Sequence, residues 1–118
     1  MNLESGDDEM AVDRIEYFEK YLDSKPNDEF ARYALAMEYG KVGRNDEAIE
    51  NYRRLIDLNP DNVPAYHQLG ILLQKLERFE EAKARLEEGL AAASRTGNSH
   101  AKSEIQALLD EIDLQIDQ

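Results

Sequence analysis

The 118-residue sequence has no cysteine and no tryptophan, and it contains only three prolines. Without cysteine the chain forms no disulfide and offers neither a thiolate metal ligand nor a thiol nucleophile. The first nine residues are acidic and lack the basic and apolar blocks of a signal peptide. We therefore expect a cytoplasmic protein, and we expect residues 1–9 to be disordered.

Long apolar runs are missing too, since no segment approaches the roughly 20 apolar residues that cross a membrane. Basic residues are few: 14 Lys and Arg face 26 Asp and Glu, and the formal net charge is −12. Residues 1–29 carry −7 of this charge and residues 99–118 carry −4, so the middle of the chain is nearly neutral. Acidic ends are repelled by nucleic-acid phosphates and by anionic lipid, so we expect neither partner.

Motifs for catalysis and metal binding are also missing. The sequence has no glycine-rich phosphate loop and no serine framed by glycines. The two histidines, His67 and His100, have no helical spacing to each other, and a lone helix histidine is seldom a ligand. We expect no enzymatic activity, no metal site and no cofactor.

An internal repeat dominates what is present. Leu35 returns as Leu69 and Ala48 as Ala82, in both cases after 34 residues, and the same interval separates Pro26 from Pro60. Apolar residues between these landmarks recur at steps of three and four, which is the pattern of amphipathic helices. A fixed period of this length is typical of stacked two-helix units.

The repeat resembles the tetratricopeptide repeat. The first copy supplies Leu35-Ala36, Tyr39, Ala48, Tyr52 and Pro60, but Arg32 stands where that family has a large residue. The second copy supplies Tyr66, Leu69-Gly70, Ala82 and Leu86, without a closing proline. The resemblance implies an all-α fold in which antiparallel helical hairpins stack into a right-handed superhelix.

The period divides the chain into about six helices in a single domain over residues 10–118. We expect a half-repeat helix over 10–25, whose apolar stripe is Val12, Ile15, Phe18, Tyr21 and Leu22, then repeats over 27–60 and 61–94. A closing helix over 99–116 would cover the last repeat, since an array otherwise exposes its core.

Small residues mark close approaches between helices. Gly70 and Gly89 lie inside helical stretches, where glycine costs about 1 kcal/mol in helix propensity, so we expect tight packing there. In the closing helix we expect Ile105, Leu108 and Ile112 to complete the core.

In the family that the sequence resembles, the first helix of each repeat lines a concave face that binds peptides or helices. Carried over, the resemblance implies a binding surface made of Phe30, Tyr33, Met37, Lys41, His67, Gln68, Ile71, Gln74, Lys75 and Lys102. Phe30, Tyr33 and Met37 are not needed for the packing of the repeat, and exposed rings and methionines are good binding anchors. Alternatively, the half-repeat or a loop covers Phe30 and Tyr33.

These observations predict a non-enzymatic protein-interaction module with a peptide or protein partner. The alternative is a structural module that forms a homodimer through exposed apolar residues such as Phe79, Leu114 and Ile116.

Overall fold

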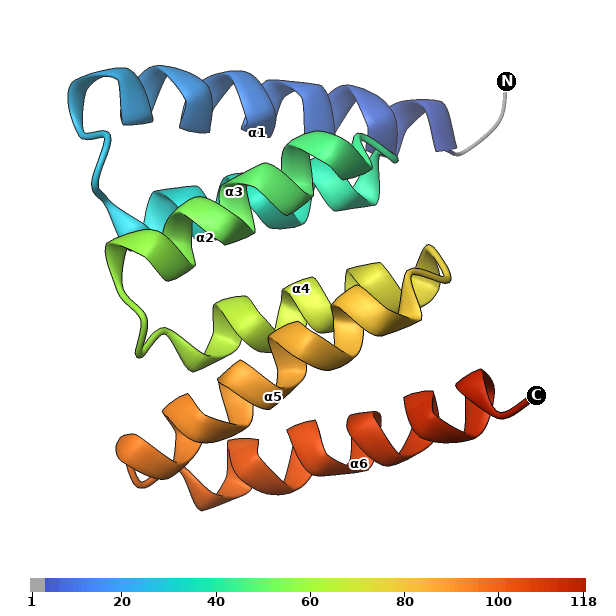
Figure 1. Ribbon diagram of the computed structural model, residues 1–118. Coiled ribbons are helices and arrows are strands. Elements are labelled where there is room, and N and C mark those ends of the chain that lie inside the picture. The colour runs from blue at the N-terminus through green and yellow to red at the C-terminus, as the bar shows by residue number, and fades with distance from the viewer. Residues whose placement is uncertain (1–3) are drawn as a thin grey trace. The chain divides into compact units, whose positions relative to one another are not determined.

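The computed structural model describes residues 4–118 and shows, in that part of the chain, six α-helices and no strand (Figure 1). The all-α prediction is confirmed. The helices are α1 (Glu4–Ser24), α2 (Glu29–Lys41), α3 (Asn45–Leu58), α4 (Val63–Lys75), α5 (Phe79–Arg95) and α6 (Ser99–Ile116).

The helices form two compact units. The first ends at Leu58 and contains α1, α2 and α3, and the second, Asn59–Gln118, contains α4, α5 and α6. The boundary falls in the turn between the two repeats, where Asn59, Pro60 and Asp61 favour a turn over a helix.

The start of α1 differs from the expectation for residues 1–9. The helix begins at Glu4 rather than near Met10, and residues 1–3 lie outside the described part. A helix that is already nucleated extends at little cost, since each added residue gains one backbone hydrogen bond. No proline lies between residues 4 and 10 to stop the extension.

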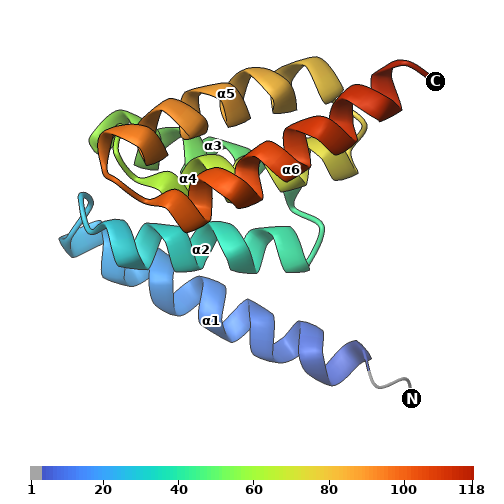
Figure 2. The same cartoon turned by 90° about the horizontal axis from the view of Figure 1, so that it is seen from below.

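In the first unit, α2 packs between α1 and α3 (Figure 2). Ile15 of α1, Leu35 of α2 and Leu55 of α3 are at most 4% exposed, and Tyr39 of α2 donates a hydrogen bond to Glu19 of α1 at 2.6 Å. The apolar stripe predicted for α1 is only partly right. Ile15 and Leu22 are buried, Phe18 and Tyr21 are half-buried, and Val12 is 49% exposed, because α2 covers a single narrow side of α1.

The polar contacts of Arg32 explain why this position of the first copy holds an arginine and not the large apolar residue of the repeat. Its guanidinium donates to Asn51 Oδ1 of α3 at 2.8 Å and to the carbonyl oxygen of Pro26 at 2.9 Å. The side chain therefore holds together the turn before α2 and the hairpin α2–α3. An apolar ring at this position would leave the two acceptors without these donors.

In the second unit, α5 packs against both α4 and α6, and α4 also contacts α6. A Cβ added to Gly70 of α4 would overlap the side chain of Leu86, and one added to Gly89 of α5 would lie 2.6 Å from Tyr66 Cβ. Both glycines are therefore sites of close helix approach, as predicted.

The closing helix α6 buries Ile105, Leu109 and Ile112, which are at most 5% exposed, whereas Leu108 is half-buried. The prediction is right for Ile105 and Ile112. Leu109 replaces Leu108 as the most buried residue between them. At 100° per residue the two positions lie equally far to either side of the 105–112 direction, so the packing of α6 against α5 and α4 decides between them.

Three helices begin with the side-chain caps that their sequences favour. Asp28, Asn62 and Asn98 each accept a hydrogen bond from the backbone N–H three residues later, at 2.8, 3.2 and 3.0 Å. Such caps satisfy N–H groups that have no partner inside the helix.

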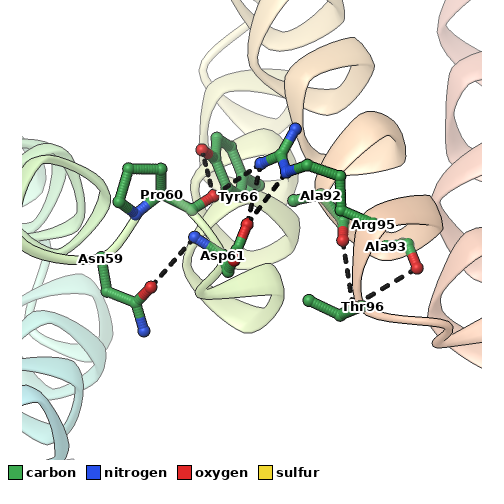
Figure 3. A network of polar contacts seen from close by, with 8 residues as sticks. All are labelled: Asn59, Pro60, Asp61, Tyr66, Ala92, Ala93, Arg95 and Thr96. Carbon is green, nitrogen blue, oxygen red and sulfur yellow. Dashed lines mark hydrogen bonds and ion pairs between the residues drawn. The ribbon is translucent and has the colours of Figure 1, made fainter.

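A polar network joins the two ends of the α4–α5 hairpin (Figure 3). Arg95, at the end of α5, donates to Asp61 Oδ1 at 3.0 Å and to the carbonyl oxygen of Pro60 at 3.2 Å. Tyr66 donates to the same Pro60 oxygen at 2.7 Å, and Thr96 caps α5 by donating to Ala92 and Ala93. The turn before α4 is thus fixed by residues from both helices of the hairpin.

Candidate functional site

The exposed face of α2 carries the three residues expected to anchor a partner. Phe30 is 81% exposed. Tyr33 and Met37 are half-buried against Tyr52 of α3: the rings of Tyr33 and Tyr52 meet edge-to-face at 6.2 Å, and the Tyr52 hydroxyl donates to Met37 Sδ at 3.0 Å. Neither α1 nor a loop covers Phe30, whereas Tyr33 and Met37 are positioned by the core while part of each stays in contact with water.

Burial also affects the hydroxyl of Tyr52. It raises the pKa of the hydroxyl above its usual value, with a further contribution from Tyr33. The hydroxyl therefore stays protonated and continues to donate to Met37, which holds the sulfur in place.

Lys41 does not stand alone at the end of α2. It lies 3.4 Å from Glu38 Oε1, and Arg14 of α1 donates to the same oxygen at 2.8 Å. Glu38 is only 7% exposed. Its burial alone would raise the pKa of the carboxyl, but the hydrogen bond from Arg14 and the charge of Lys41 outweigh burial and hold this pKa below its usual value. Glu38 is a buried charged residue that the sequence analysis did not single out.

The corresponding face of α4 is more polar. His67 and Gln68 are half-buried, Ile71 is 38% exposed, and Lys75 is exposed. Gln74 donates to Gln115 of α6 at 2.9 Å, so this expected binding residue is partly engaged inside the unit. Lys102 lies exposed on α6.

The repeat places equivalent residues on α2 and α4. Tyr33 corresponds to His67, Met37 to Ile71 and Lys41 to Lys75, each 34 residues apart. None of the six is buried. Both first helices therefore leave the same side uncovered, with a ring, then an apolar side chain, then a lysine along it.

A feature that the sequence analysis missed lies between α1 and the start of α2. Here the surface contains a hollow with a volume of about 240 Å³. It is lined by Tyr17, Phe18, Tyr21, Asp28, Phe30 and Ala31. Tyr17, which is 62% exposed, stacks on Tyr21 at 6.4 Å and meets Phe18 edge-on at 5.3 Å. The sequence signal was present, since Tyr17 lies outside the apolar stripe of α1 and its ring has no place in the core.

Two further kinds of site are absent from the described residues. No three His, Cys, Asp or Glu side chains gather there in a way that could hold a metal ion. No helix in that part of the chain combines the length and apolar character needed to span a bilayer.

Family models match the chain in two overlapping stretches. The "TPR repeat" model covers residues 36–77, and the "Tetratricopeptide repeat" model covers residues 63–96. Together they extend from α2 to the end of α5, which are the helices that carry the repeated packing residues.

Known proteins give the same result. A tetratricopeptide repeat domain protein from Salinibacter ruber is 32% identical; the match covers 74% of this chain and 88% of that chain, with a TM-score of 0.70. The peroxisomal targeting signal receptor of Saccharomyces cerevisiae is 34% identical over 68 residues, 58% of this chain. The chain spans 11% of the length of the first two curated relatives that it matches.

A structure with lower identity has the same fold. The TPR2B domain of yeast Sti1, solved as a complex with pHsp70, matches 86% of this chain and 81% of that chain with a TM-score of 0.79 at 19% identity. The repeated two-helix hairpins, the family models and these similarities agree: the chain belongs to the tetratricopeptide repeat family.

Proposed function

We propose that the chain is a non-enzymatic interaction module that binds a peptide or a helix of a partner protein through the uncovered sides of α2 and α4. Tetratricopeptide repeat domains generally mediate protein–protein interaction. One relative is named as a receptor for a targeting signal, and one similar structure is a complex with pHsp70, so both concern recognition of another protein.

The observation that carries the proposal is the repeated exposure of equivalent residues. Tyr33, Met37, His67 and Ile71 stay partly in contact with water, although the core of each unit is filled by other side chains. Rigid rings lose little entropy on binding, and a half-buried anchor is already positioned for its partner. The cytoplasmic setting stays a prediction.

Selection of peptides from a random displayed library against the immobilised chain tests this proposal. Enriched peptides are then measured by fluorescence anisotropy against Tyr33→Ala and Ile71→Ala. We expect each variant to weaken binding by roughly tenfold or more, as for hot-spot anchors. Glu50→Ala on α3 and Glu87→Ala on α5 change exposed residues of the second helices and should bind like the parent.

Two outcomes contradict the proposal. Either no peptide is enriched over the background of an unrelated protein, or enriched peptides bind the α2 and α4 variants as tightly as the parent. A melting temperature for each variant shows whether a loss of binding is a loss of folding.

Self-association is the second candidate. Leu114 of α6 is 67% exposed and Ile116 is 37% exposed, whereas Phe79 is half-buried and contributes less. An apolar patch of this kind favours contact with a second copy. A dilution series by light scattering should then show a dimer that dissociates, and Leu114→Glu should give a monomer at all concentrations.

A further inference from the structure

The hollow between α1 and α2 has no role in the core of its unit. We propose that it binds a lysine or arginine side chain of the partner, an inference that rests on the proposed function because it assumes a peptide ligand. The lining combines aromatic rings with a single charged residue, the carboxylate of Asp28.

The position of α1 explains why the hollow is open. By the 34-residue period, Phe18 corresponds to Tyr52 of α3 and Leu86 of α5. These two counterparts are 3% and 0% exposed because the first helix of their own hairpin covers them, whereas Phe18 is half-buried. In the described residues no equivalent helix covers Phe18, which lines the hollow.

Size indicates a single side chain as the occupant. The hollow measures about 240 Å³. Sites for whole small molecules are usually larger, at roughly 300–1,000 Å³. Phe30 and Tyr17 are the two most exposed lining residues, at 81% and 62%, so a side chain carried on a peptide backbone outside can reach the lining.

The rings favour a cation. The face of an aromatic ring is negative, and it attracts ammonium and guanidinium groups within about 6 Å of its centroid. The protein already shows this contact, since Lys25 Nζ lies 5.6 Å from the centroid of the Tyr21 ring. The stacked pair of Tyr17 and Tyr21 extends this negative surface along the hollow.

The carboxylate of Asp28 also favours a positively charged occupant. One oxygen accepts the N–H of Ala31 at 2.8 Å, and the other accepts the Tyr21 hydroxyl at 3.4 Å, so the group is held in place before any ligand arrives. A purely apolar occupant would strip water from this charge without replacing it, which is costly. A basic side chain lays its apolar stem along the rings and keeps its charged head beside Asp28.

Capped single amino acids test the inference without any partner. N-acetyl-lysine methylamide, N-acetyl-arginine methylamide and N-acetyl-norleucine methylamide are titrated while the ring protons of Tyr17, Tyr21 and Phe30 are followed by NMR. We expect saturable shifts, with the two basic probes binding roughly fivefold or more tightly than norleucine.

Asp28→Asn is the matched variant. Asparagine caps a helix as well as aspartate does, so α2 keeps its N-terminus while the charge is removed. Lysine binding should fall to the level of norleucine. Asp57→Asn removes the same charge from an exposed position at the end of α3, outside the hollow, and should change nothing. Phe30→Leu removes an exposed ring and should also reduce the preference for the basic probes.

Equal affinity of norleucine and lysine would overturn the inference and make the hollow a pocket for apolar side chains. An absence of ring shifts with every probe would overturn it as well. These results leave the proposed function standing if selected peptides still require Ile71. Conversely, the capped lysine could bind tightly while the peptide selection fails. The hollow would then still prefer basic side chains, and the proposed function would be wrong.

Discussion

At the scale of single residues, glycines inside helices have opposite effects according to what surrounds them. Gly40 of α2 has no atom within 4 Å of the position that a Cβ would take, whereas at Gly89 of α5 that position lies 2.6 Å from Tyr66 Cβ. Alanine is favoured over glycine by about 1 kcal/mol in a helix interior. The neighbouring helix therefore decides whether a glycine-to-alanine change raises or lowers the free energy of unfolding.

We expect Gly89→Ala to lower the free energy of unfolding by about 1–3 kcal/mol, because overpacking outweighs the gain in propensity. Gly40→Ala should raise it by about 0.5–1 kcal/mol. Urea denaturation of both variants measures the difference. A Gly89→Ala protein as stable as the parent would show that α4 and α5 can separate without cost.

The buried carboxylate of Glu38 predicts a pH effect. Arg14 and Lys41 hold its pKa below the usual glutamate value of about 4.3, so the stability that it contributes is present above that pH. This contribution is lost as the pH falls through the lowered folded-state pKa. Glu38→Gln should cost about 1 kcal/mol at pH 7 and progressively less below pH 4.

Thermal melts of the parent and Glu38→Gln between pH 3 and pH 7 test this expectation. The contributions of all other acidic residues cancel in the difference between the two melting temperatures. Glu50→Gln, at an exposed position of α3, is the control and should track the parent. A Glu38→Gln difference that does not change with pH would contradict the ion-pair explanation.

At the scale of helices, α6 contributes a face to the core of its unit. Ile105 and Ile112 are fully buried and Leu109 is 5% exposed. Burial of such side chains contributes roughly 1.5–3 kcal/mol each before entropy. A chain that ends at Asn98 should therefore melt many degrees lower or aggregate, and removal of residues 117–118 alone should have little effect. A melting temperature equal to the parent's would make α6 peripheral.

The helices themselves could be predicted from the sequence because their signals are local or periodic. The period of 34 residues located the hairpins, and Asp28 and Asn62 are residue types that favour the capping positions they occupy. The hollow could not be predicted in this way. Periodicity put Phe18 and Tyr21 in the stripe of α1, but only packing decides that Phe18 stays half-buried while Ile15 is 2% exposed.

At the scale of the whole chain, the two units have unequal cores. Five of the seven largest fully buried side chains, Leu69, Leu73, Leu86, Ile105 and Ile112, belong to the second unit. In repeat proteins, stability is approximately a sum of repeat and neighbour terms, so units can open separately. We expect amide hydrogen exchange to be slowest in α4 and α5 and faster in α1–α3. Slowest exchange in α2 would contradict this order.

The pairing of Arg95 with Asp61 has a consequence for the length of the chain between them. The two residues lie 34 positions apart and therefore hold equivalent positions of the repeat, Asp61 in the turn before α4 and Arg95 at the end of α5. The contact therefore depends on repeat length, because it forms only when the hairpin between the two residues has the standard number of residues. A residue inserted into α5 between Leu86 and Arg95 would shift Arg95 by 100° around the helix relative to the packed residues before it, and carry it away from Asp61. Because both side chains are about half exposed, the loss itself would cost little, at most about 1 kcal/mol. The pair thus distinguishes correct from incorrect repeat length without being a main source of stability.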